Sequence, residues 1–493
     1  MTQQLKQQPL SREKASAKIE KPLFREIGKI ADKNGFDAYV VGGFVRDCFL
    51  ERYSKDIDVV VVGEGIAFAE LVARHFEEIY GEKPSFAVFK RFGTAQIKTD
   101  DYEIEFVGAR RESYSADSRK PFVEDGTLED DLSRRDFTIN ALAFSLNTGD
   151  FGELVDAFGG EEDLSRGIIR TPVDPYITFS DDPLRMMRAI RFSTQLDFSL
   201  DDRVLDSITQ NQERIKIISA ERINDELNKI LMADVPSKGF KLLEKTGLLQ
   251  IIFPEFQELK GVETIQDQSH KDNFYHTLQV LDNVATYEGG LWLRWAALLH
   301  DIGKPRTKKF DPQEGWTFHG HEVVGAKMVP KIFKRFRLPL NEKMKFVQKL
   351  VRLHLRPVSL ATEEVTDSAI RRLIYEAGDD IDDLMTLCKA DVTSKNPKKV
   401  RKIRRRFQDL GQQIEEVEEK DKLRNWQPPI TGEIIMEVFN ISPGKYVGVI
   451  KEHIKEAILN GDISNNYEEA FNLMLEKGKD LGLEPVNEEN HRP

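Results

Sequence analysis

Residues 39–62 read YVVGGFVRDCFLERYSKDIDVVVV, and this stretch decides the fold of the first part of the chain. A short apolar run ends at Gly42 and Gly43, and a second apolar run begins with Asp56 and Asp58. Side chains two positions apart in a strand face the same side, so the two carboxylates can share divalent cations. Such cations hold the phosphates of a nucleotide for in-line displacement, and glycines let backbone N–H groups approach a phosphate. The stretch predicts a metal-dependent nucleotide site, although an isolated acidic pair can also be a solvated strand end.

The combination of the glycine pair and the acidic pair resembles the nucleotidyltransferase superfamily. The form Gly-Gly-Phe-Val-Arg-Asp, which contains Arg46, is similar to class II tRNA nucleotidyltransferases and bacterial poly(A) polymerases. The resemblance implies a polymerase-beta-like α/β head with catalytic Mg²⁺ at Asp56, Asp58 and a third carboxylate. Glu103 and Glu105 share one face of a strand-like stretch, and we expect Glu105 to be that third residue, with a solvated strand face as the alternative.

Residues 131–143, DLSRRDFTINALA, are the second match to this family. Arg134 and Arg135 offer two guanidinium groups, which suit triphosphate oxygens. Asp136 and Asn140 offer polar groups for a ribose edge. An Arg-Arg-Asp triplet alone is common on protein surfaces, so its place after the acidic pair is what indicates a site. The resemblance assigns triphosphate binding to Gly42, Gly43, Arg46, Arg134 and Arg135.

A base-selecting helix is predicted to begin at residues 181–183, because acids and proline are typical of a first turn. Asp182 and Arg185 are three positions apart and would share a face of that helix. An acceptor beside a donor matches the Watson–Crick edges of cytosine and adenine, whereas guanine and uracil would leave buried polar groups unpaired. The run is similar to the family's Glu-Asp-x-x-Arg templating motif, with Asp181 in place of Glu, and the resemblance adds Arg188 to the nucleotide site. The alternative is that Asp182 only caps the helix.

Six histidine and aspartate side chains follow one another in an order that suits a metal site: His276, His300, Asp301, His321, His354 and Asp391. Imidazoles and carboxylates in this mixture suit transition metals such as Mn, Ni, Co, Fe or Zn. The adjacent His-Asp pair, followed by Gly-Lys, resembles the HD phosphohydrolase superfamily. An RNA end closed as a 2′,3′-cyclic phosphate has no free 3′-OH to extend, so we expect phosphodiesterase or phosphatase activity on such ends. A scaffold that keeps the motif without turnover is the alternative.

The expected organisation is multidomain, with an α/β nucleotidyltransferase head followed by an all-α neck, an HD body and a tail. The expected parts are a disordered N-terminus at 1–23, the head at 24–160, the neck at 161–258, the HD metal-binding domain at 259–400 and a helical, tRNA-binding tail at 401–493. Strands are expected at 37–41, 58–62, 94–98, 102–108 and about 141–146. RNA-binding basic surface is expected at Lys395, Lys398, Lys399, Arg401, Lys402, Arg404, Arg405 and Arg406, unless these belong to a solvated charged helix.

Composition bounds the kind of protein. The net charge is −12, from 72 Lys and Arg against 84 Asp and Glu, so RNA contacts should come from local basic surface. The only two cysteines, Cys48 and Cys388, lie far apart in sequence and argue against a disulfide framework. No apolar stretch has the length of a membrane span, and residues 1–20 lack a hydrophobic signal core. We expect a cytoplasmic protein without membrane contact.

The resemblance covers most of the chain and implies a CCA-adding tRNA nucleotidyltransferase whose partners are tRNA, CTP and ATP. Residues 92–95, FGTA, resemble the tRNA nucleotidyltransferase version of the head more than the poly(A) polymerase version. An enzyme that adds only A or only CC, a poly(A) polymerase, and an HD phosphohydrolase with an RNA-binding head are the alternatives. The oligomeric state, monomer or homodimer, is left open.

Overall fold

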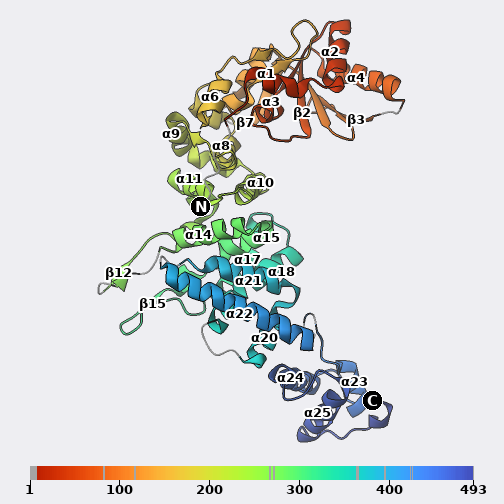
Figure 1. Cartoon of the computed structure of the whole chain (residues 1–493), viewed down its shortest axis with the longest axis vertical. Helices are drawn as coiled ribbons and strands as arrows, with labels where there is room; N and C mark the ends of the chain where they lie inside the picture. The colour runs from red at the N-terminus through yellow and green to blue at the C-terminus, as the bar shows by residue number, and fades with distance from the viewer. Residues whose placement is uncertain are drawn as a thin grey trace. The chain divides into compact units, whose positions relative to one another are not determined.

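The structure, a computed structural model, describes residues 8–81, 84–115, 118–265, 268–269, 272–361, 366–393, 396–421, 424 and 426–491. The chain divides into two compact units, Met1–Pro254 and Glu255–Pro493. The first unit carries a large sheet, and the second is built mainly of helices (Figure 1). The expected fold class, an α/β head followed by helical parts, is confirmed. The finer division into five parts stays a prediction.

A mixed seven-stranded sheet forms the head, in the order β3-β4-β5-β2-β1-β8-β9. β2 pairs with β5 in parallel, and the other neighbouring strands of this sheet are antiparallel. Val59, Val60 and Val61 are fully buried in β2, so this strand is covered on both faces. The strands are β1 (Asp37–Val41), β2 (Asp56–Val62), β3 (Ser85–Phe89), β4 (Thr94–Lys98), β5 (Glu103–Gly108), β8 (Ala143–Ser145) and β9 (Leu154–Val155).

Helices cover this sheet, and α4 packs on β4 and β5 through Phe68, whose ring lies 5.9 Å from that of Phe106. A separate hairpin, β6 (Arg110–Ser115) with β7 (Ser118–Asp125), follows β5. Neither this hairpin nor β3 was predicted, because edge strands and exposed ribbons lack the apolar alternation that marks a half-buried strand. The helices are α2 (Pro22–Asn34), α3 (Gly43–Phe49), α4 (Gly65–Tyr80), α5 (Leu128–Ser133) and α6 (Gly160–Arg166).

The prediction of disorder up to residue 23 was wrong for residues 12–19. These residues form α1 (Arg12–Ser16) and the 3-10 turn Ala17–Ile19. Ala15 and Ile19, four positions apart, are both fully buried, so the segment docks on the head through one apolar edge. Leu10 N–H also donates a hydrogen bond to Phe49 O at 2.9 Å. Residues 1–7 lie outside the described residues.

Short helices follow the head, and one of them corrects the predicted base-selecting helix. Asp182 does not lie on the helix of Arg185, because it ends α7 and adopts extended backbone with φ −130°. The reason is Pro183, since the residue before a proline is disfavoured in helical conformation. The helices are α7 (Pro175–Asp181), α8 (Leu184–Leu196), α9 (Asp202–Asn211), α10 (Ala220–Leu231), α11 (Ser237–Lys245) and α12 (Leu248–Ile252).

At the centre of the packing in the second unit lies an apolar helix, α15, which contains the fully buried Trp295 and is followed by His300. Its neighbours α14, α18 and α21 pack on α15. The main helices are α14 (Asn273–Thr286), α15 (Leu291–Leu299), α17 (His321–Arg335), α18 (Glu342–Leu353), α20 (Asp367–Ala377) and α21 (Ile381–Asp391).

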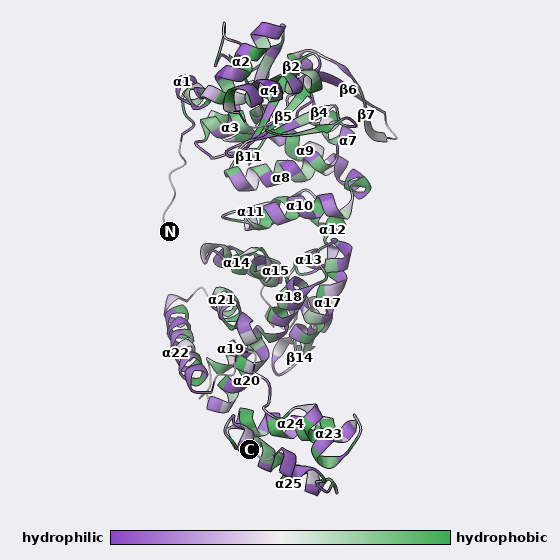
Figure 2. Ribbon diagram, turned by 90° about the vertical axis from the view of Figure 1, so that its right-hand side faces the viewer, coloured by the Kyte–Doolittle hydropathy of each residue, from purple (hydrophilic) through white to green (hydrophobic). Residues whose placement is uncertain are grey.

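The long helix α22 (Pro397–Asp421) packs on α20 and α21 and is largely hydrophilic (Figure 2). Three further helices, α23 (Gly432–Phe439), α24 (Lys445–Asn460) and α25 (Tyr467–Asp480), share an apolar core that includes Ile435, Ile454 and Phe471. None of the helices in the described part of the chain combines the length and the apolar character needed to cross a bilayer.

Candidate functional site

The sheet register places the predicted carboxylates side by side. Asp58 of β2 pairs with Glu105 of β5, and Asp56 pairs with Glu103, so all of these side chains lie on one face of the sheet. Glu103 is engaged by Lys98, whose Nζ lies 2.9 Å from its Oε1. Burial raises the pKa of Asp58; Arg135 opposes that rise, and the charges of Glu105 and Asp56 add to it. The register and the ion pair of Glu103 therefore favour Glu105 as the third carboxylate.

A cleft of about 380 Å³ opens over Asp58 and Glu105. It brings together predicted residues from the head and the neck, and it adds Arg110 and Arg222, which the sequence analysis did not assign to the site. Its polar lining consists of Asp58, Thr94, Glu105, Arg110, Arg134, Arg135, Asp136, Asp182, Arg185, Arg188 and Arg222. A cleft lined by both carboxylates and guanidinium groups suits a metal-bound polyphosphate.

Gly42 is required by the shape of this site. Its φ is +78°, and a Cβ there would lie 2.6 Å from Nη1 of Arg135 and 3.5 Å from Oδ2 of Asp58. Its own N–H donates to Leu142 O at 3.0 Å and is not available to a phosphate. Gly43 is the first residue of α3, where N–H groups have no acceptor within the helix. A phosphate would therefore meet the N-terminus of α3 from Gly43 onward.

The guanidinium groups of Arg134 and Arg135 are held by one buried carboxylate. Asp131 is fully buried, and its two oxygens lie 2.5 Å from Arg134 Nη2 and 3.1 Å from Arg135 Nη2. Asp131 precedes the two arginines by three and four positions, the spacing at which side chains on a helix meet. That spacing is the signal by which the sequence could have identified Asp131 as a positioning residue.

Four other predicted residues bind one another. Arg46 Nη1 donates to Asn140 Oδ1 at 2.8 Å, and Asn140 Nδ2 donates to Asp136 Oδ1 at 2.9 Å. Arg188 Nε donates to the other oxygen of Asp136 at 2.7 Å. Burial raises the pKa of Asp136, but Arg188 and Asn140 outweigh it and lower the pKa to about 2. This network fixes α3, the 131–143 segment and α8 around the cleft, and a ribose contact by Asp136 or Asn140 stays a prediction.

Asp182 and Arg185 reach the same cleft although they do not share a helix. Oδ1 of Asp182 accepts the N–H of Leu184 at 3.2 Å, and its Oδ2 lies 3.8 Å from Arg222 Nη2. Arg185 Nη2 donates to the carbonyl of Arg134 at 2.6 Å. Asp182 therefore accepts the N–H of the first residue of α8 and also lines the cleft with Arg185. Their role in base selection stays a prediction.

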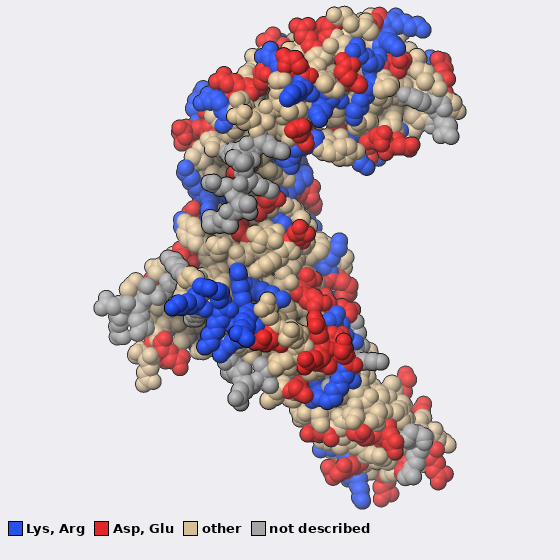
Figure 3. Space-filling view, viewed as in Figure 1, with Lys and Arg blue, Asp and Glu red and all other residues tan. Residues whose placement is uncertain are grey.

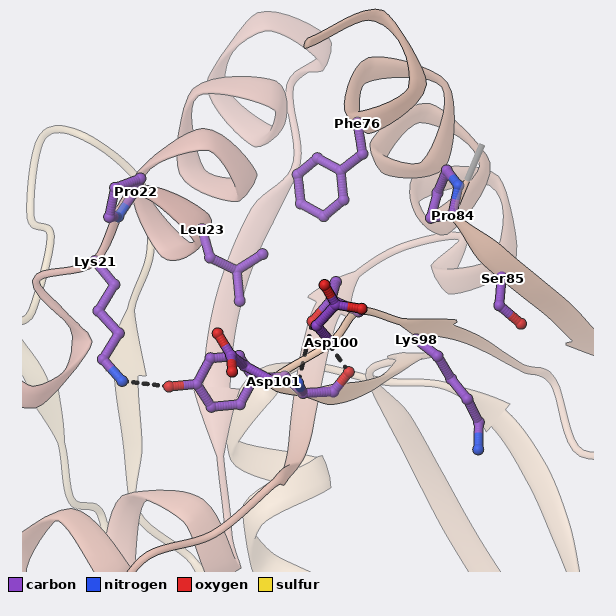
Figure 4. Close-up of a pocket in the computed structure, with 11 residues that line it drawn as sticks. Lys21, Pro22, Leu23, Phe76, Pro84, Ser85, Lys98, Asp100 and Asp101 are labelled. Carbon is purple, nitrogen blue, oxygen red and sulfur yellow. Dashed lines mark hydrogen bonds between the residues drawn. The ribbon is translucent and has the colours of Figure 1, made fainter. Parts of the chain in front are cut away.

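The head has a larger pocket, of about 820 Å³, in a different place (Figure 4). It lies between the start of α2, the end of α4 and the turn before β5, and its apolar lining includes Leu23 and Phe76. Lys21 donates a hydrogen bond to the hydroxyl of Tyr102 across it (Figure 4). No predicted site residue lines this pocket, so the chemistry of the lining rather than the volume makes the smaller cleft the candidate site.

The six predicted metal ligands of the second unit converge. They form two groups of three donors, one made of His276, His300 and Asp391 and the other of Asp301, His321 and His354. Asp301 lies between the groups, with Oδ2 3.3 Å from His300 Nε2 and Oδ1 3.3 Å from His321 Nε2. Such an arrangement fits one or two metal ions.

The histidine rings are oriented as metal-binding imidazoles are. Nδ1 of His300, His321 and His354 lies 2.7 Å, 2.8 Å and 2.8 Å from a backbone carbonyl, which places the proton on Nδ1 and leaves each Nε2 as a donor to the centre. The fully buried Nε2 of His300 meets the criteria of a hydrogen bond with no described residue, and it faces Asp301 Oδ2 at 3.3 Å and Asp391 Oδ1 at 3.7 Å. Imidazole nitrogens and carboxylate oxygens that converge in this way can hold a metal ion.

The residues of this centre differ in the pKa of their imidazoles and in the exposure of their side chains. Burial alone would lower the pKa of His300, but the carboxylates of Asp301 and Asp391 raise it to about 8. Burial and the neighbouring His300 lower the pKa of His354 to about 4. The side chains of His276 and Asp391 are 12% and 21% exposed, whereas those of His300 and Asp301 are 0% and 2% exposed. The centre therefore opens to solvent on the side of His276 and Asp391.

The predicted basic surface lies on α22. Figure 3 shows Lys and Arg side chains gathered over the first half of this helix and acidic side chains beside the second half. The exposed members are Lys398, Arg401, Lys402, Arg404 and Arg405. Lys395 lies outside the described residues, and the side chain of Lys399 is not described.

Three family models match the chain in succession. The poly(A) polymerase head domain matches residues 38–170, the probable RNA and SrmB-binding site of polymerase A matches residues 197–260, and the HD domain matches residues 273–396.

Two curated relatives are an A-adding enzyme and a multifunctional CCA protein. The A-adding tRNA nucleotidyltransferase of Deinococcus radiodurans is 33% identical over 349 residues, which cover 69% of this chain and 77% of that protein. The multifunctional CCA protein of Neisseria gonorrhoeae is 36% identical over 309 residues, which cover 61% of this chain and 70% of that protein.

Solved structures show the same fold. The Thermotoga maritima CCA-adding enzyme complexed with tRNA-CCA has a TM-score of 0.60 and 24% identity, and the match covers 96% of this chain and 100% of that chain. A tRNA nucleotidyltransferase complexed with a primer tRNA and an incoming ATP analog has a TM-score of 0.55 and 26% identity, and the match covers 78% of this chain and 98% of that chain.

Proposed function

This chain belongs to the family of tRNA nucleotidyltransferases that carry a poly(A) polymerase head, and we propose that it adds C and A from CTP and ATP to the 3′ end of tRNA. The observation that carries the proposal is the single cleft shared by Asp58 and Glu105, by Arg134 and Arg135, and by Asp182. Catalytic, phosphate-binding and base-reading groups thus lie within the reach of one nucleotide.

The reaction joins the 3′ oxygen of tRNA to the α-phosphorus and breaks the bond between that phosphorus and the pyrophosphate oxygen. Asp56, Asp58 and Glu105 would hold Mg²⁺, which when bound stabilises the attacking and leaving oxygens. Arg134 and Arg135, fixed by the buried Asp131, would bind the oxygens of the leaving pyrophosphate. The protein's own contribution is to hold the triphosphate in line with the incoming hydroxyl.

Base choice without a nucleic acid template would depend on Asp182 and Arg185. A carboxylate and a guanidinium in the lining of the cleft complement the edges of C and A and leave unpaired groups against G and U. The ion pair of Asp182 with Arg222 and the bond of Arg185 to the Arg134 carbonyl support this placement.

The number of nucleotides added distinguishes full CCA addition from the addition of A alone, and named relatives of both kinds exist. The deciding assay uses tRNA that ends before C74, with CTP alone, ATP alone or both. We expect two C with CTP alone and CCA with both nucleotides. Use of ATP only, and only on tRNA that already ends in CC, would make the protein an A-adding enzyme, and long A tracts would make it a poly(A) polymerase.

The HD centre carries a second proposed activity, hydrolysis of 2′,3′-cyclic phosphate ends by a transition metal, with Mn, Ni, Co, Fe or Zn as candidates. Six converging donors and an opening beside His276 and Asp391 support it. A metal bound there would lower the pKa of a coordinated water. Lys304, whose Nζ lies 2.6 Å from Asp301, stands beside the centre as a cation for the phosphate.

The test of this second activity is hydrolysis of a 2′,3′-cyclic nucleotide after reconstitution with each metal. The variant His300→Ala should abolish hydrolysis and leave nucleotide addition unchanged, because the two sites lie in different units. Equal hydrolysis by both proteins, or none with any metal, would reduce the centre to a structural site.

The remaining proposals are a tRNA-binding surface on α22 and a cytoplasmic location. The exposed cations of α22 would contact phosphates of tRNA, each adding to the salt dependence of binding. A cytoplasmic location agrees with the two buried, unpaired cysteines, because a reducing compartment keeps thiols free.

A further inference from the structure

The turn between β3 and β4 exposes two aromatic rings and two cations. Phe89, the last residue of β3, is 45% exposed, and Phe92 is 65% exposed. Lys90 and Arg91 between them are also exposed, and no described residue forms an ion pair with either. The turn is ordered, since Phe92 N–H donates to Phe89 O at 2.8 Å and Gly93 takes a φ of +66°. Large apolar rings held in solvent beside cations that form no ion pair within the described part of the chain indicate a binding surface.

Phe89 lies on the sheet face that carries the catalytic carboxylates. It pairs with Thr94 of β4, and Thr94 pairs with Val107 of β5. Val107 in turn pairs with Val60, which follows Asp58 by two positions in β2. Paired residues and residues two apart in a strand point to the same side of a sheet. The row from Asp58 to Phe89 therefore lies on one face of the sheet, where Val60 is buried and Asp58, Val107 and Thr94 line the cleft.

A hydrogen bond connects the turn to a residue of the cleft, but the turn is too far from Asp58 to contact a nucleotide bound there. Arg110, which lines the cleft, donates from Nη1 to the carbonyl of Phe92 at 3.4 Å. Three strand spacings and two residues along a strand separate the backbones of Phe89 and Asp58, which is about 16 Å. A ligand that contacts Phe89 would therefore be a part of a substrate that extends along the sheet, away from the reacting phosphate.

The sheet order tells which substrate extends in that direction. The predicted triphosphate-binding residues follow β1 or precede β8, and both strands lie on one side of β2. β5, β4 and β3 lie on the other side. In-line displacement places the attacking oxygen opposite the leaving pyrophosphate. The RNA that supplies the attacking 3′-OH therefore approaches from the side of β5, β4 and β3.

We propose that residues 89–93 form a stacking platform for the single-stranded 3′ end of the RNA, upstream of the nucleotide that carries the attacking hydroxyl. Aromatic faces bind successive bases regardless of identity, because every base has a π-face, and neighbouring cations follow the phosphates. Tolerance of base identity suits an end whose last bases change after every addition. The platform deepens the proposed nucleotidyl transfer and rests on it for the identity of the RNA.

The experiment compares Phe92→Leu, which keeps an apolar side chain, with Phe92→Tyr, which keeps the ring, in the full chain. We expect Phe92→Leu to raise the KM for tRNA by about fivefold or more and to leave the KM for CTP unchanged, since one stacked base contributes about 1–3 kcal/mol. Phe92→Tyr should restore the value of the natural chain. The double variant Lys90→Ala/Arg91→Ala should reduce the slope of log KM against log salt by about 1.4. Lys33→Ala, an exposed cation on α2, is the control.

Direct binding of a single-stranded RNA that ends in CC, measured by fluorescence anisotropy, completes the test without nucleotide addition. Weaker binding by Phe92→Leu but not by Phe92→Tyr supports the platform even if the natural chain fails to add nucleotides, which would refute only the proposed reaction. An unchanged KM for tRNA and an unchanged Kd in Phe92→Leu would overturn the platform. A KM that rises equally for tRNA and CTP would also overturn it, because the turn would then only shape the cleft.

Discussion

Replacing Gly42 by alanine should strain the backbone and displace Arg135, whereas the same change at its neighbour Gly43 should do neither. The Cβ added at Gly42 would lie 2.6 Å from Nη1 of Arg135, which Asp131 holds in place. Gly42 also has a φ of +78° and a ψ of −134°, a region that L-residues avoid. The Cβ added at Gly43 would meet only Arg46 Nη2, at an ordinary 3.7 Å. Adjacent glycines therefore form a matched pair of variants.

We expect the two substitutions to change the stability and the kcat/KM for CTP by different amounts. Backbone strain at Gly42 should lower the free energy of unfolding by about 1–3 kcal/mol, and about 2–4 °C in Tm per kcal/mol is expected for a unit of this size. Displacing Arg135 from the triphosphate removes a charge-assisted hydrogen bond of about 1.5–3 kcal/mol, which is about 10- to 150-fold in kcat/KM for CTP. Gly43→Ala should leave Tm unchanged or raise it, because alanine favours a helix.

The assay is calorimetry of both variants together with single-nucleotide incorporation from labelled CTP. Loss of activity in Gly43→Ala without loss of Tm would indicate that a phosphate comes close to its N–H. The reasoning would be refuted if Gly42→Ala had the Tm and kcat/KM of the natural chain, since alanine is strained at a φ of +78° and its Cβ would displace the guanidinium of Arg135.

Three other results are expected. Asp58→Ala should lower kcat by several orders of magnitude with a smaller loss of CTP binding, and near-normal incorporation would contradict the proposed metal-binding carboxylates. Asp182→Ala or Arg185→Ala should increase U and G incorporation relative to C and A, and unchanged discrimination would place base selection elsewhere. The low pKa of Asp136, about 2, means that its ion pair with Arg188 stabilises the fold fully above about pH 4 and loses about 2 kcal/mol as pH falls from 4 to 2. In urea unfolding, the free energy of unfolding of Asp136→Asn should fall less between pH 4 and pH 2 than that of the natural chain. An unchanged pH dependence would mean that Asp136 is not the group that titrates.

Local patterns in the sequence determined the chemistry of this protein. The glycine pair, the acidic pair in an apolar run and the Arg-Arg-Asp phrase each occupy a short segment, so their spacing along the chain already indicates the backbone that carries them. The order of histidines and aspartates similarly indicated a metal centre, and the structure brings those side chains together. Strands such as β1 and β4 were predicted at their observed bounds, because their side chains alternate or are apolar throughout.

Contacts between distant segments decided what the sequence left open. The parallel register of β2 and β5 placed Glu105 beside Asp58, and no pattern within either strand contains that pairing. Burial of Asp131 made it the common anchor of two arginines, and Pro183 moved Asp182 off the predicted helix without removing it from the cleft. The sheet order placed the exposed β3–β4 turn on the same sheet face as Asp58 and Glu105, which no local pattern in the turn indicates. Side-chain type is a local property, but register, burial and a shared cleft depend on packing between segments far apart in the chain, and packing is specified only by the whole fold.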